Sequence, residues 1–194
     1  MKLLRFGAIA LLVLAMLYVG ACVATAGDDD GPLEHRWSIE LPHSSERLWA
    51  IMQDYDVWPE YAPMVIDVEV LHPGDETGDG LLRRVLFQMP LGRQGTALEL
   101  VTDVEHARGY TYTMISDTPG NDQTGRVRLE RLGPNRTRLH FEERFNLTDF
   151  PWRLFESQIY SFINRKNEES MRAMSEWLTG HPEYRPELIA TAGT

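Results

Sequence analysis

The sequence predicts an α+β domain in which a curved, seven-stranded antiparallel sheet is covered by a long C-terminal helix. Short segments that alternate apolar and polar residues, as half-buried strands do, recur between residues 35 and 148. One long segment follows, 150–179, in which apolar residues recur every three or four positions, as on one face of a helix. A length of 194 residues with 43% hydrophobic content suits one such domain plus an extension.

The extension is an N-terminal leader typical of an exported protein. Lys2 and Arg5 precede an apolar run over residues 6–26, and three aspartates follow it. As a helix this run is roughly 30 Å long, about the thickness of a bilayer core. Basic residues before the run and acids after it place the N-terminus in the cytoplasm. We therefore expect an extracytoplasmic, periplasmic domain that meets the membrane through its N-terminus.

Three fates of this leader remain open. Val19-Gly20-Ala21-Cys22 resembles a bacterial lipobox, in which Cys22 carries a lipid anchor. Ala24-Thr25-Ala26 fits cleavage by signal peptidase, which would release a soluble domain. Without cleavage, residues 1–26 would stay as a single-pass anchor. The polar segment 27–34, which contains Gly and Pro, is predicted to be a flexible linker.

The domain opens with a strand and two short helices. Residues 35–41 alternate in polarity and predict the strand, which Pro42 ends. A short amphipathic helix comes next, with Ser44 or Ser45 as its N-cap. Residues 56–63, with a proline near each end, predict a second and shorter helix.

Six further strands complete the predicted sheet. Alternation without proline in the strand interiors places them at 64–71, from the loop 72–80 to about Met89, and at 96–104, 110–116, 123–132 and 136–148. Consecutive strands joined by short turns pair antiparallel. A sheet of this size twists and curls, so that a helix can lie in its concave face.

The long helix over 150–179 is predicted to end at Gly180, and residues 181–194 are expected to form a loose tail. Eight apolar residues make one stripe along it: Phe155, Ile159, Phe162, Ile163, Met171, Met174, Trp177 and Leu178. Such a stripe faces the core of a small domain.

This order of elements resembles the START/polyketide-cyclase-like (SRPBCC) superfamily, whose helix-grip fold is shared with plant pathogenesis-related allergens. The segments that carry the resemblance are 37–49, 54–63 and the terminal helix. Trp58-Pro59-Glu60-Tyr61 is similar to the corresponding piece of coenzyme-Q-binding and polyketide-cyclase-like members. The resemblance covers about residues 35–179 of a domain placed at 35–180, and it includes no invariant catalytic motif.

The resemblance implies a cavity between sheet and helix, which the superfamily uses for lipids, sterols, quinones and polyketides. The residues that we expect to bind the ligand are Trp58, Tyr61, Phe87, Tyr112, Phe141, Glu143, Phe155, Ile159 and Phe162. The first half of the long helix is the expected ligand wall. Its second half, from Met171 to Leu178, is expected to be plain core.

Glu143 is the most notable titratable residue. Three apolar side chains share the inward face of the strand 136–148: Leu139, Phe141 and Phe145. Glu143 has the same parity, and a carboxylate in an apolar interior must be paired, hydrated or protonated. In one interpretation it holds a ligand headgroup or acts as a weak acid or base. In the other it pairs with Arg83 or Arg84 across the sheet, or it lies near an exposed strand end.

Composition and motifs argue against several classes of function. A formal net charge of −10 disfavours nucleic-acid binding, because such a surface repels phosphate backbones. The six histidines and Cys22 show no spacing typical of metal ligands, and no phosphate-binding loop or nucleophile elbow is present. We therefore expect no metal, no cofactor and no assignable catalytic residue.

Three hypotheses of function follow. The leading one is a membrane-tethered binding or carrier domain for a hydrophobic small molecule such as a lipid or a quinone. The second is a cyclase, dehydratase or hydrolase that uses an inward carboxylate, with Glu143 and perhaps Glu99, His140 or Tyr112 as its groups. The third is a protein-interaction module that uses the outer face of the sheet or the tail.

Overall fold

The computed structural model describes residues 11–21, 33–88, 92–115, 121–147 and 156–184. Cys22, Phe155 and the predicted start of the long helix lie outside these ranges. Most of the predicted linker 27–34 and of the predicted tail also lies outside them.

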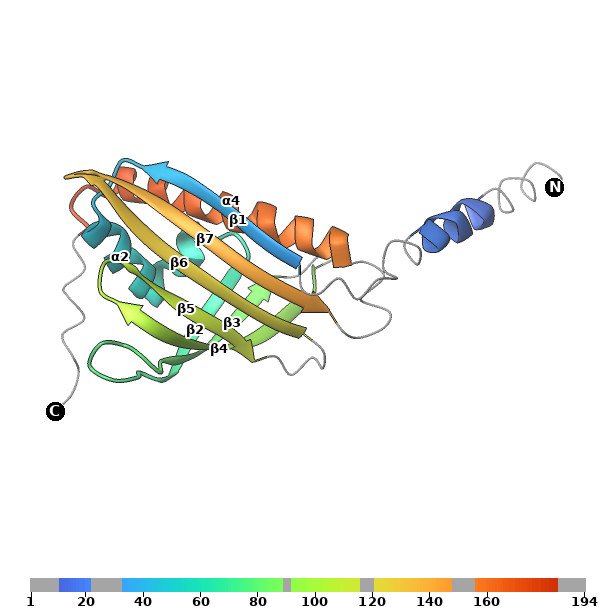
Figure 1. The fold of residues 1–194 in the computed structure, drawn as a ribbon, viewed down its shortest axis with the longest axis horizontal. Coiled ribbons are helices and arrows are strands. Elements are labelled where there is room, and N and C mark those ends of the chain that lie inside the picture. The colour runs from blue at the N-terminus through green and yellow to red at the C-terminus, as the bar shows by residue number, and fades with distance from the viewer. Residues whose placement is uncertain (1–10, 22–32, 89–91, 116–120, 148–155, 185–194) are drawn as a thin grey trace.

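Seven strands form one sheet in the order β1-β7-β6-β5-β4-β3-β2, and every neighbouring pair is antiparallel. Their bounds are Leu33–Leu41 (β1), Val65–His72 (β2), Leu82–Gln88 (β3), Gln94–Glu105 (β4), Gly109–Ile115 (β5), Asn121–Gly133 (β6) and Arg136–Leu147 (β7). The predicted seven-stranded antiparallel sheet is confirmed. Figure 1 shows that it is strongly curved.

Three short helical segments join β1 to β2, and one long helix ends the domain: α2 (Ser45–Gln53), η1 (Tyr55–Val57), α3 (Trp58–Tyr61) and α4 (Glu156–Gly180). Ser44 caps α2, because its hydroxyl accepts a hydrogen bond from the Arg47 amide. The helix predicted over 56–63 is instead a 3₁₀ turn followed by a single α-helical turn with Pro59 near its start. Proline is tolerated there because the first amides of a helix have no intrahelical partner.

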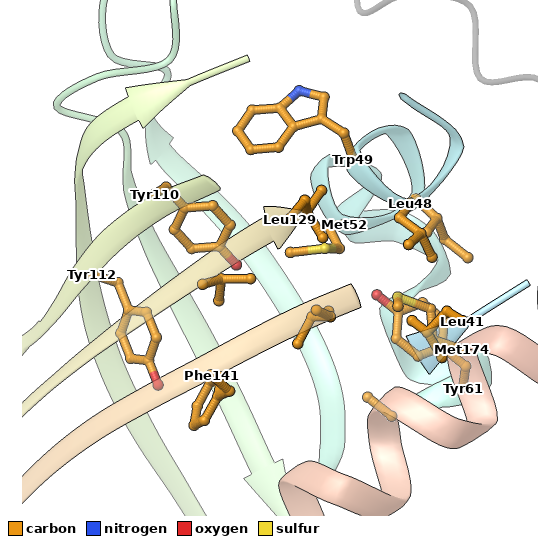
Figure 2. Close-up of a cluster of buried hydrophobic side chains, with 14 of the residues drawn as sticks. Leu41, Leu48, Trp49, Met52, Tyr61, Tyr110, Tyr112, Leu129, Phe141 and Met174 are labelled. Atoms are coloured by element: carbon orange, nitrogen blue, oxygen red, sulfur yellow. The ribbon is translucent and has the colours of Figure 1, made fainter. Parts of the chain in front are cut away.

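The inner face of the sheet carries the core, as the alternation predicts. Odd-numbered residues of β6 and β7 are buried from Gln123 to Leu129 and from Thr137 to Phe145. Figure 2 shows core side chains converging from α2, β5, β6, β7 and α4. Met174 and Leu178 are fully buried and are the α4 residues at the centre of this cluster. The second half of α4 is therefore core.

Polar contacts hold the same half of α4 against the short helices. Arg47 donates to the carbonyl oxygens of Leu178 and His181, at 2.8 and 2.6 Å. His43 Nε2 lies 3.1 Å from the Ser175 carbonyl oxygen. Because α2 supplies Arg47 and the preceding turn supplies His43, the C-terminal end of α4 is fixed to the opening of the domain.

The described parts of the two ends add detail to the predicted boundaries. Residues 11–21 are helical, and within the described ranges no helix is long and apolar enough to span a membrane. Strand β1 begins at Leu33, inside the predicted linker. At the other end, the Tyr184 hydroxyl donates to Asp54, and the Tyr184 ring packs edge-on against Trp177. The start of the predicted loose tail is thus packed against the domain.

Candidate functional site

Four residues form one row across the inner face of the sheet. In the strand register Tyr112 of β5 is opposite Gly125 of β6, Gly125 is opposite Glu143 of β7, and Glu143 is opposite His35 of β1. Residues opposite each other in adjacent strands project from the same face. The row therefore brings a phenol, a carboxylate and an imidazole to the same part of the interior.

Gly125 makes room for the contact between Tyr112 and Glu143. A β-carbon at this position would overlap the Tyr112 ring. With only hydrogen there, the ring lies across β6, and its hydroxyl donates to Glu143 Oε1 at 3.0 Å. The glycine is required here by close approach of a side chain rather than by its own backbone angles.

Glu143 is buried, with 2% of its surface exposed, so the predicted inward orientation is confirmed. Its Oε1 accepts hydrogen bonds from Tyr112 and from the Gln123 amide, and Oε2 lies 3.4 Å from Asn167 Nδ2 of α4. The alternative that paired it with Arg83 or Arg84 is wrong. These hydrogen-bond partners are all neutral groups, and they lie on β5, β6 and α4.

The environment of Glu143 favours its protonated form. Burial raises the pKa of Glu143 above its ordinary value of 4.5, and the charge of Glu99 adds to this effect. The hydrogen bonds from Gln123 and Tyr112 act in the opposite direction but do not cancel it. Burial, followed by the nearby charge of Glu143, also raises the pKa of Tyr112 well above its ordinary value.

Arg83 forms a buried ion pair with Glu99 on the adjacent strand. Its Nε and Nη2 atoms lie 2.8 and 2.7 Å from Glu99 Oε2. Burial is the largest single influence and opposes the charged form of Arg83, but Glu99, Tyr110 and Tyr55 together outweigh it and keep the pKa of Arg83 above its ordinary value. Arg84, the next residue, faces outward and pairs with Glu69.

Aromatic rings surround the Arg83 guanidinium. Its central carbon lies 4.4 Å from the Trp58 ring centroid, 5.0 Å from that of Tyr55 and 5.9 Å from that of Tyr110. Cation–π contacts of this kind are strongest where water is excluded. Trp58 of α3 is thereby placed over the ion pair.

The first half of α4 brings a second set of polar groups to Glu143. Tyr160 contacts the rings of His35 and Phe145, with centroid separations of 5.7 and 6.4 Å. Asn164 follows one turn later and is buried. Three buried polar atoms here have no hydrogen-bond partner among the described residues: Tyr160 Oη, Asn164 Oδ1 and His35 Nε2. Unpaired buried polar atoms are uncommon and are typical of sites that bind water or a ligand.

The predicted ligand-binding residues lie in three settings. Tyr61, Tyr112 and Phe141 belong to the packed core cluster, and Trp58 packs against it from the side. Phe87 of β3 and Ile159 and Phe162 of α4 are half-buried. Their contact with a ligand stays a prediction. His140, a candidate for the enzyme hypothesis, lies on the outer face beside Glu130.

Sequence reasoning did not identify several residues of this site: Arg83 as a partner of Glu99, and Gln123, Gly125, Asn164 and Asn167 as neighbours of Glu143. Their parity on strands was readable, but the pairing of particular residues depends on strand register. Asn164 and Asn167 stand one turn apart among charged residues of the helix, so the sequence pattern did not distinguish them from exposed polar residues.

The outer face of the sheet carries a separate, open depression of about 890 Å³. Arg126, Arg128, His140 and Glu142 line it, together with the turn between β4 and β5. Its charged lining does not suit an apolar ligand, and it lies on the opposite face from Glu143. Within the described ranges, no group of three or more His, Cys, Asp or Glu side chains could hold a metal ion.

The family described as polyketide cyclase / dehydrase and lipid transport matches residues 34–179. The chain belongs to this family. No curated protein matches the sequence. Membership of this family, together with the curved sheet and the long terminal helix, suggests a domain for hydrophobic ligands.

Solved structures share the fold at low sequence identity. The Zhui aromatase/cyclase from a Streptomyces species is 16% identical, with a TM-score of 0.67 over 84% of this chain and 100% of its own. A START superfamily protein from Mycobacterium smegmatis is 16% identical, with a TM-score of 0.61 over 76% and 99%. Ara h 8.0201 is 15% identical, with a TM-score of 0.62 over 77% and 99%. At these identities the likeness concerns the fold alone.

Removing one partner of the Arg83–Glu99 pair is expected to destabilise the domain strongly. Arg83→Met leaves a buried carboxylate without its cation, so we expect the free energy of unfolding to fall by about 3–5 kcal/mol. Urea denaturation measures it. Arg84→Met, which breaks the exposed neighbouring pair, is the matched control and should cost about 1 kcal/mol or less. A loss for Arg83→Met no larger than this control would contradict the buried-pair interpretation.

The raised pKa of Glu143 predicts a specific pH dependence of stability. Between 4.5, its ordinary pKa, and its raised pKa, the folded state holds a proton that the unfolded state has released. The contribution of Glu143 to the free energy of unfolding is therefore fully present below pH 4.5, and it is lost as the pH rises through the raised pKa. Relative to wild type, Glu143→Gln should become progressively more stable as the pH increases from 4.5 towards neutrality.

The measurement is urea unfolding at several pH values for wild type and for Glu143→Gln. Only the difference between the two proteins is interpreted, because other carboxylates titrate in both. Glu142→Gln, one residue away on the outer face, is the matched control. A parallel pH profile for wild type and Glu143→Gln would rule out the raised pKa.

Proposed function

We propose that this protein binds and carries a hydrophobic small molecule between the sheet and the first half of α4. The observation that carries the proposal is the buried Glu143 cluster, which faces a half of the helix that adds no residue to the core cluster. Apolar surface would supply most of the affinity, and a few polar groups would set the ligand's orientation. The fold and family support this use, since the family's own description includes lipid transport.

The two halves of α4 differ in a way that suits ligand entry. Met174 and Leu178 anchor the second half in the core, and Arg47 donates a hydrogen bond to the Leu178 carbonyl oxygen near the C-terminal end of the helix. Ile159 and Ile163 of the first half are only half-buried. The first half can therefore move outward to admit a ligand without dismantling the core.

The leader supports a membrane-tethered, extracytoplasmic location for this activity. Lys2 and Arg5 before the apolar run favour a cytoplasmic N-terminus, and Cys22 offers a lipid anchor. A tether would hold the ligand site beside the bilayer, where hydrophobic molecules partition. The three fates of the leader differ in how the domain is held, and the anchor at Cys22 is the one that we propose.

A bound apolar molecule is expected to copurify with the full-length chain. Organic extraction followed by mass spectrometry should detect it in amounts close to those of the protein. Ile163→Trp, which adds bulk beside Tyr160 and Asn167, should lower that amount because the indole fills the ligand's space. The exposed Ser161 of the same helix provides the matched control, and Ser161→Trp should leave the amount unchanged.

Two results would contradict the carrier function. Absence of any extractable molecule from wild type, together with failure to bind an added apolar fluorophore, would remove it. Recovery of a molecule that the protein converts to a new compound would instead favour the cyclase, dehydratase or hydrolase alternative, for which Glu143 and Tyr112 are the converging titratable groups.

The anchor is tested by metabolic labelling with a radioactive fatty acid in a bacterial host. The wild-type chain is expected to carry the label, whereas Cys22→Ser removes the sulfur that would be acylated and should carry none. Cys22 is the only cysteine of the chain, so label on the substituted protein cannot come from another thiol. An unlabelled wild-type chain would exclude the lipoprotein.

A further inference from the structure

We infer that the polar end of the ligand is a hydrogen-bond donor, preferably a cation such as an alkylammonium group, and that Glu143 is its acceptor. This inference rests on the proposed function, since it names the class of molecule that the same site would take. The inference specifies whether the polar group of the ligand, bound at Glu143, is positive, neutral or negative.

The buried charges of the described residues do not cancel. Three buried side chains are of formally charged types: Arg83, Glu99 and Glu143. Arg83 and Glu99 neutralise each other at 2.7 Å. Glu143 is left as the one buried acid whose hydrogen-bond partners are all neutral. A cation bound at Glu143 would favour the ionised carboxylate and pair with it, whereas an anion would find no cation among the hydrogen-bond partners of Glu143.

Arg83 is poorly placed to neutralise Glu143 or to receive an anionic headgroup. Two of its nitrogens are bonded to one oxygen of Glu99. Its remaining terminal nitrogen has no hydrogen-bond partner, but the guanidinium is covered by the rings of Trp58, Tyr55 and Tyr110. An anion would have to displace these rings to reach it.

The other groups around Glu143 add no positive charge. Burial lowers the pKa of His35, the β1 residue opposite Glu143, and so favours the neutral imidazole. Tyr112 and Gln123 are neutral donors, and Glu99 of β4 adds negative charge. On α4, Lys166 is paired with Glu169.

Two oxygens near α4 still lack a good donor. Glu143 Oε1 accepts from both Tyr112 and Gln123, but Oε2 has only the long contact of 3.4 Å to Asn167. Asn164 Oδ1, one turn away from Tyr160, has no partner among the described residues. Both oxygens are acceptors, so each calls for a ligand group that carries N–H or O–H donors, and an ammonium has three.

Three ligands of equal chain length test the sign of charge: dodecylamine, dodecanol and dodecanoate. The full-length chain, in an uncharged detergent, is loaded with the neutral fluorophore N-phenylnaphthylamine, and each ligand is titrated until the fluorophore is displaced. Wild type, Glu143→Gln and Glu142→Gln are compared under the same conditions. Partition of each ligand into the detergent is the same for all three proteins, so it cancels when the preference between ligands is compared from one protein to another.

We expect wild type to bind the amine roughly tenfold or more tightly than the acid, with the alcohol between them, because only the ammonium can form an ion pair with Glu143 and the acid finds no cation there. Glu143→Gln should lose most of this preference, and Glu142→Gln, whose substitution lies on the outer face, should keep it. Equal displacement by all three ligands, or tighter binding of dodecanoate, would overturn the inference and leave the proposed carrier function intact. Failure of the fluorophore to bind, together with the absence of any extractable molecule from wild type, would overturn both.

Discussion

The concave face of the sheet has to be shielded from water, and α4 is the element that shields it. The helix does this unevenly. Met174 and Leu178 are buried in the core, while Arg47 donates hydrogen bonds to the carbonyl oxygens of Leu178 and His181 at the C-terminal end of the helix. The N-terminal half meets the sheet mainly through polar and half-buried side chains. One helix thus closes the core at one end and leaves the other end available for recognition.

The buried charged side chains lie in two different environments. Arg83 and Glu99 form an ion pair under aromatic rings. Removal of either partner would leave the other as a buried charge with no counterion, which is strongly destabilising. Glu143 has no such cation and is held by a phenol and two amides. Neutral donors stabilise a carboxylate less than a cation does, so burial wins and the pKa rises. A pair of the first kind favours stability, and a group of the second kind is typical of a binding or reactive site.

The outer face of the sheet is chemically distinct from the interior. Its side chains form exposed ion pairs across neighbouring strands, such as Glu40 with Arg136 and Arg138. Exposed pairs of this kind add little to stability, because water screens them. They do keep the outer face strongly polar, which disfavours the edge-to-edge and face-to-face association to which a large antiparallel sheet is prone.

The sequence alone determined the strands, their succession along the chain and the long helix, because alternation and the spacing of apolar residues are local properties of the chain. It also determined that Glu143 points inward, since parity within one strand fixes the face. Only the tertiary structure decided what Glu143 meets. Tyr112, Gln123 and Asn167 come from three other elements, and the pairing of Arg83 with Glu99 removed the expected cation. These contacts depend on register between strands and on the placement of α4 over them, which no pattern within a single segment encodes.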